Sequence, residues 1–86
     1  MAFKIRTLNK CLRIASTMNP KRYLRLDGRK LVEIIKLLLP ESEGQPAAVC
    51  VQLVKIGRSY KWDMARMTSA QEEGFLAWLV MEVAKG

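Results

Sequence analysis

Residues 47–67 read AAVCVQLVKIGRSYKWDMARM, and the fold class predicted for the chain depends on them. Many of their side chains are β-branched or aromatic, and Gly57-Arg58 divides them into two shorter runs, 47–56 and 59–67. Glycine at the first position of a two-residue loop is typical of a type II′ β-hairpin. The segment therefore predicts two antiparallel strands joined at Gly57-Arg58.

The register of this hairpin follows from the loop. It places Leu53 opposite Trp62 and Val51 opposite Met64, because residues equally far from the turn face each other. The expected core face of the hairpin then contains Val49, Val51, Leu53, Tyr60, Trp62 and Met64. The other face is a mixture of polar and apolar side chains and suits partial exposure.

Two segments before the hairpin have the apolar spacing of amphipathic helices. In residues 3–17 the apolar face consists of Ile5, Leu8, Cys11, Leu12 and Ala15. In residues 29–39 it consists of Leu31, Ile34, Ile35 and Leu38. Asn19-Pro20 and Pro40 are expected to end these helices, since the residue before a proline is steered away from helical angles.

A third helix is predicted after the hairpin. Ser69 and Glu72 have the spacing of a capping box, in which each side chain satisfies a backbone amide of the first turn. The helix extends to about Ala84, and Trp78 and Met81 lie away from its main apolar side. They are predicted either to bind a protein partner or to be buried, with the last helix packed between the sheet and the first helix.

Residues 22–26 add a short strand, because Leu24 and Leu26 alternate with Tyr23 and Arg25. The predicted order is α-β-α-β-β-α, a small α+β fold with a C-terminal hairpin followed by a packed helix. At 86 residues the chain has room for one core, so residues 1–86 are expected to form a single domain.

Composition favours a folded cytoplasmic protein. Half of the residues are apolar, but no apolar run approaches the roughly 20 residues that cross a bilayer. The two cysteines, Cys11 and Cys50, lack the density of a disulfide scaffold and the spacing of a zinc site. Residues 1–26 have the composition of a mitochondrial transit peptide, although a structural helix is the favoured interpretation.

The sequence argues against an enzyme and against a cofactor or metal. There is no histidine, which removes the commonest general base and the Ser-His and Cys-His nucleophile pairs. No glycine-rich phosphate loop or Cys-x-x-Cys is present. Basic ribonucleases can work with Lys, Arg and Tyr alone, but Tyr23, Arg25, Tyr60 and Lys61 define no motif, and we do not adopt that interpretation.

Positive charge is concentrated in the first half of the chain. Residues 1–36 contain ten Lys or Arg and two acidic residues, whereas residues 37–86 contain five basic and six acidic residues. Such asymmetry indicates a polyanionic partner, here the backbone of DNA or RNA. The candidate binding residues are Arg6, Lys10, Arg13, Lys21, Arg22, Tyr23, Arg25, Arg29 and Lys30. The less favoured interpretation is that the same charge serves solubility alone.

Protein binding is the alternative function. The last helix could dock on a partner through Trp78 and Met81, as a homodimer or as an inhibitor, and the basic face could meet an acidic protein. The first helix could also lie on an anionic membrane surface, but this is the less favoured interpretation because the chain needs its apolar face for the core.

Overall fold

The structure is a computed structural model that describes residues 2–18, 28–60 and 68–86. These residues form four α-helices and one short 3₁₀-helix, and none of them is in a strand. The elements are α1 (Ile5–Ser16), α2 (Gly28–Leu38), η1 (Leu39–Glu41), α3 (Pro46–Tyr60) and α4 (Ser69–Ala84). The α+β fold predicted from the sequence is therefore wrong.

The error lies in residues 47–60, which form most of helix α3 and not the first half of a hairpin. Pro46 is the first residue of α3, where its fixed φ angle suits a helix and its missing amide hydrogen is not needed. Gly57 lies inside the helix and has no positive φ angle, so it does not form the predicted turn. The second predicted strand overlaps α3 at Ser59 and Tyr60, and residues 61–67 lie outside the described part of the chain.

The burial of residues along α3 shows why their alternating apolar pattern led to the wrong prediction of a strand. Val49 and Leu53 are fully buried, whereas 56% of Val51, midway between them, is exposed. A strand would place all three on one face, but a helix places residues four apart together and turns the intervening one away. Ile56 continues the buried line, so the apolar period of this segment is helical and its β-prone composition is overruled by packing.

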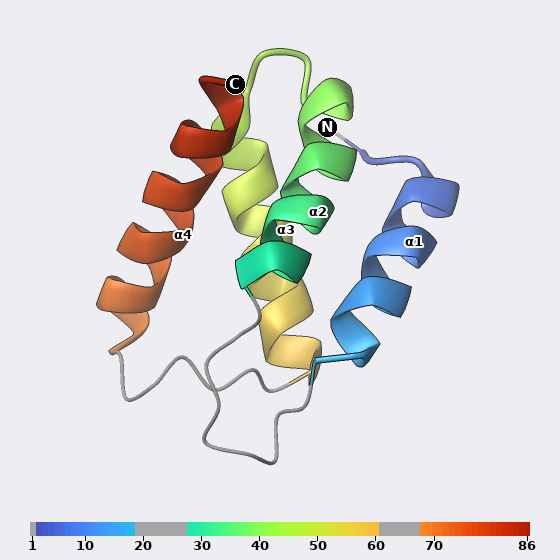
Figure 1. Ribbon diagram of the computed structural model, residues 1–86, viewed down its shortest axis with the longest axis horizontal. Coiled ribbons are helices and arrows are strands. Elements are labelled where there is room, and N and C mark those ends of the chain that lie inside the picture. Colours follow the sequence, from blue (N-terminus) through green and yellow to red (C-terminus); the bar gives the residue numbers. More distant parts are fainter. Residues whose placement is uncertain (1, 19–27, 61–67) are drawn as a thin grey trace.

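The four helices pack around one core (Figure 1). In this view α2 lies in front of α3 in the middle of the molecule, while α1 and α4 flank them at opposite ends of the long axis. Helix α1 packs on α2 and α3, and α4 packs on the same two helices from the other side. The fully buried aliphatic side chains come mainly from the central pair: Leu31, Ile34, Ile35, Leu38, Val49 and Leu53.

The start of α4 is capped one residue earlier than the sequence indicated. The Thr68 hydroxyl accepts a hydrogen bond from the Gln71 amide at 3.1 Å, and the Gln71 side chain accepts one from the Thr68 amide at 2.9 Å. Thr68 and Gln71 thus form the capping box assigned to Ser69 and Glu72. The predicted strand at 22–26 lies outside the described residues.

Candidate nucleic-acid interface

A narrow row of buried side chains determines which face of α1 is turned towards the core. Thr7, Cys11 and Ala15, spaced one turn apart, face the core. Ile5 was predicted on this apolar face, but 76% of it is exposed. The small buried side chains let α1 approach α2 and α3, while Leu8 and Leu12 are only half-buried at the edge of the contact.

The N-terminus of α1 is capped by a residue distant in sequence. The helix has no acidic residue in its first turn, and its N-cap residue, Lys4, makes no side-chain cap. Glu41 provides the negative charge and the capping acceptor that α1 itself lacks. Its carboxylate accepts a hydrogen bond from the Lys4 amide at 2.9 Å and another from the Thr7 hydroxyl. These bonds, Thr7 first, hold the pKa of Glu41 below its usual value.

The C-terminus of α1 lies beside the start of α2. The Lys30 ammonium donates a hydrogen bond to the Thr17 carbonyl at 3.4 Å, an arrangement that satisfies a free carbonyl and complements the negative end of the helix dipole. Arg29 lies next to it and is exposed. Two cations predicted from the sequence are therefore placed at this end of α1.

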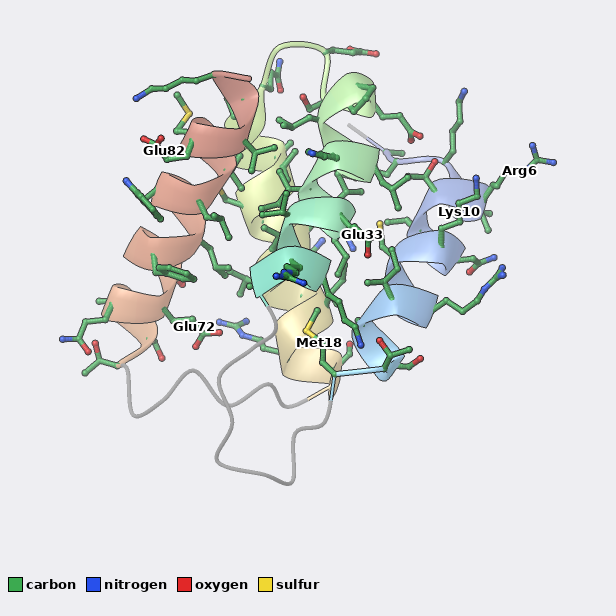
Figure 2. All side chains as sticks on the ribbon, in the orientation of Figure 1. Arg6, Lys10, Met18, Glu33, Glu72 and Glu82 are labelled. Carbon is green, nitrogen blue, oxygen red and sulfur yellow. The ribbon has the colours of Figure 1, made fainter. Side chains whose placement is uncertain are left out.

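Three cations occupy the face of α1 opposite the core. Arg6, Lys10 and Arg13 are all exposed and follow each other at intervals of about one turn. With Ile5 and Asn9 they line a shallow, open depression of about 510 Å³. We call Arg6, Lys10 and Arg13 the basic face. Figure 2 shows Arg6 and Lys10 extending from α1 away from the other helices.

No described carboxylate forms an ion pair with the basic face. Between residues of the three described ranges there is one ion pair, in which Lys85, directly after α4, lies 3.3 Å from Glu82 in its last turn. Glu72 and Glu82 lie at the opposite end of the molecule from Arg6 and Lys10 (Figure 2). The positive charge of the basic face is therefore not neutralised by the acidic residues of α4.

Four other candidates, Lys21, Arg22, Tyr23 and Arg25, lie outside the described residues. The structure thus brings together Arg6, Lys10 and Arg13 on α1, and places Arg29 and Lys30 at the adjoining end of α2. Whether the remaining cations join this surface stays a prediction.

The predicted protein-binding residues are exposed on α4. Trp78 is 57% exposed and Met81 is 48% exposed. The Trp78 ring contacts that of Phe75, with centroids 6.1 Å apart. Neither residue belongs to the core, which contains Leu76 and Val80 of the same helix.

The described residues offer little reactive chemistry. Burial raises the pKa of the Cys11 thiol to about 11, with a further contribution from the charge of Glu41, and burial also raises the pKa of Cys50. Both thiols are thus mainly neutral near pH 7 and poor nucleophiles. No group of three or more metal-ligating side chains occurs within the described ranges. None of the helices there is both long and apolar enough to span a bilayer.

Comparisons with known proteins give no relative. No family model matches the chain, and searches of curated proteins and of solved structures find no significant match.

Proposed function

We propose that this protein is a small nucleic-acid-binding accessory or regulatory protein that contacts phosphates through the basic face of α1. The observation that supports the proposal most is the alignment of Arg6, Lys10 and Arg13 along one exposed helix face without a described carboxylate partner. Two free cysteines fit a reducing, cytoplasmic compartment.

The dimensions of the basic face suit a phosphate backbone. At a rise of 1.5 Å per residue, Arg6 and Arg13 are separated by about 10 Å along the helix axis. Measured along the axis of a DNA duplex, one strand has about three phosphates over that length. Three cations can therefore contact successive phosphates of one strand, which gives affinity without sequence selectivity.

The test measures binding to a fluorescently labelled DNA duplex and an RNA duplex of unrelated sequence, at two salt concentrations. The site variant is Arg6→Gln/Lys10→Gln/Arg13→Gln. The matched control is Lys36→Gln/Lys55→Gln/Lys85→Gln, which removes the same charge from three exposed positions, on α2, on α3 and directly after α4. This control distinguishes loss of binding at the basic face from a general effect of lower net charge.

We expect the wild-type chain and the control to bind at low salt, and the site variant to bind at least about tenfold more weakly. Each neutralised phosphate contributes about −0.9 to the slope of log affinity against log salt. The slope of the site variant should therefore be shallower by about 2.7. Equal losses in both variants, or binding that does not respond to salt, would rule out the basic face as the site.

An acidic protein surface presents carboxylates where a nucleic acid presents phosphates. Competition distinguishes the two, because a duplex should displace an acidic polypeptide such as poly-glutamate from the basic face at low salt. Binding of poly-glutamate in the absence of any duplex binding would support the acidic-protein alternative and contradict nucleic-acid binding.

A further inference from the structure

A second surface, formed by other helices than the one that bears the basic face, has the features of a docking site. Helices α3 and α4 pack side by side and leave between them an open groove of about 970 Å³. Apolar side chains form most of its lining: Ala47, Cys50, Val51 and Val54 from α3, and Ala77 and Met81 from α4. We call this surface the α3/α4 groove.

The apolar surface continues from the groove around the outside of α4. Beyond Ala77 and Met81 come Gly74 and then Trp78, all of them exposed. Nothing lies within 4 Å of the position that a Cβ atom would occupy at Gly74, so another helix can approach closely there. From Gly74 to its end, α4 is thus apolar on nearly all sides apart from Glu82, a property of helices that are covered on more than one face.

The two walls of the groove carry opposite charges. Lys55 and Arg58 lie on the α3 wall, and Glu73 lies on the α4 wall. The two helices run in opposite directions (Figure 1), so the end of α3 and the start of α4 are at the same end of the groove. Arg58, near the end of α3, and Glu73, near the start of α4, therefore lie at the same end of the groove on opposite walls.

We propose that the α3/α4 groove binds a second copy of this chain. A two-fold axis running along the groove places the α3 wall of each copy over the α4 wall of the other, in the self-complementary manner of symmetric dimers. The wall that bears Lys55 and Arg58 in one copy then faces the wall that bears Glu73 in the other. The exposed parts of Val51 and Met81 are covered in the same contact.

The charge arrangement selects this occupant. A uniformly acidic helix in the groove would be attracted by Lys55 and Arg58 but repelled by Glu73, and a uniformly basic helix would meet the reverse. A surface with one wall of each sign is complementary to its own two-fold image, so a copy of the chain satisfies both walls. This interface lies on other helices than the basic face, so the proposal does not depend on nucleic-acid binding.

The first experiment measures the molar mass of the full chain by sedimentation velocity from about 1 μM to about 1 mM, a range that includes weak dimers. We expect a concentration-dependent dimer. Ala77→Glu places a carboxylate in the apolar groove and should raise the dimer dissociation constant by at least about tenfold. Ser16→Glu adds the same charge to an exposed position on α1 and should leave the dissociation constant unchanged.

The second experiment tests the crossed charge pairing. Lys55→Glu/Arg58→Glu gives a chain with both walls acidic, and Glu73→Lys gives a chain with both walls basic. Each alone should dimerise at least about tenfold more weakly than the wild type, whereas an equimolar mixture should form a mixed dimer. Native mass spectrometry distinguishes the mixed dimer by its mass, and circular dichroism checks that both variants are folded.

A chain that remains monomeric at about 1 mM overturns the proposal. A dimer whose dissociation constant does not respond to Ala77→Glu, or charge variants that fail to associate in the mixture, overturns it as well. Duplex binding is measured separately at low protein concentration, so loss of one result leaves the other intact.

Discussion

The hydroxyl of Thr7 donates a hydrogen bond to the carboxylate of Glu41, 34 residues later in the chain. The same carboxylate accepts the Lys4 amide, so η1 provides the N-terminal cap of α1. A capping carboxylate satisfies free amides and complements the positive end of the helix dipole. The helix that bears the basic face is thus fixed in place by a residue from the connection between α2 and α3.

Removing this cap should destabilise the protein. We expect the free energy of unfolding to fall in the order wild type, Glu41→Gln, Glu41→Ala, because the amide keeps one acceptor and the methyl group keeps none. Urea unfolding followed by circular dichroism measures the effect. Glu43→Gln is the matched control, since Glu43 is an exposed carboxylate in the same connection. Equal stability of all four proteins would show that the Glu41 bonds do not contribute.

The same carboxylate predicts a dependence of stability on pH. The pKa of Glu41 is lowered in the folded state from an ordinary value of 4.5, so the folded protein binds this proton less readily than the unfolded chain. The contribution of Glu41 is therefore complete above pH 4.5 and is lost as the pH falls through the lowered pKa. Urea unfolding at a series of acidic pH values should show a smaller loss for Glu41→Gln than for the wild type. Parallel curves would contradict the assignment.

Substitutions at Val49 and Val51 test whether this segment is a helix, as in the structure, and not a strand of the expected hairpin. Val49 is fully buried and Val51 is 56% exposed. Val49→Ala should lower the free energy of unfolding by about 1–3 kcal/mol through lost burial and a small cavity. Val51→Ala should change it by less than about 0.5 kcal/mol, as is usual at the surface. Unfolding at low micromolar concentration avoids any effect of association. Similar losses in the two variants would favour a strand.

The two thiols should differ in reactivity towards a disulfide reagent at pH 8. Cys11 is fully buried and its pKa is raised to about 11, whereas Cys50 is half-buried in the lining of the α3/α4 groove. We expect one faster phase from Cys50 and one much slower phase from Cys11, and Cys50→Ser should abolish only the faster one. The faster phase should also slow as protein concentration rises, because a dimer covers Cys50. A rapid Cys11 reaction in the folded chain would contradict its burial.

Local patterns in the sequence identify three of the four helices. The apolar spacing in 3–17 and 29–39, and the polar start before the last helix, correspond to α1, α2 and α4. These segments carry apolar residues at helical intervals together with a proline or a capping residue at an end. Their existence therefore follows from information within each segment.

Helix α3 is not predicted because its residues support two periods at once. Val49 and Leu53 are compatible with both a strand face and a helix face, and the β-branched composition favours the strand. Only the burial of Val49 and Leu53 with the exposure of Val51 separates the two. That distinction depends on α1, α2 and α4 packing around α3, which no local pattern contains.

In the candidate site, too, some features follow from local sequence and others depend on contacts between distant residues. The common face of Arg6, Lys10 and Arg13 follows from their spacing, and the structure places that face outward. The cap by Glu41 could not be found, because it joins residues far apart in sequence, and the α3/α4 groove could not be found because it needs α3 as a helix. The exposure of Ile5 reflects a rotation of α1 onto its smaller residues Thr7, Cys11 and Ala15.

The placement of α1 and α4 at opposite ends of the long axis determines the valence of any assembly (Figure 1). Two chains joined through α3 and α4 would direct their α1 helices outward, in opposite directions. The two α1 helices could not both bind neighbouring phosphates of one short site. Such a pair would instead bridge separate stretches of a polyanion and draw them towards each other, with each end free to release and rebind without the other.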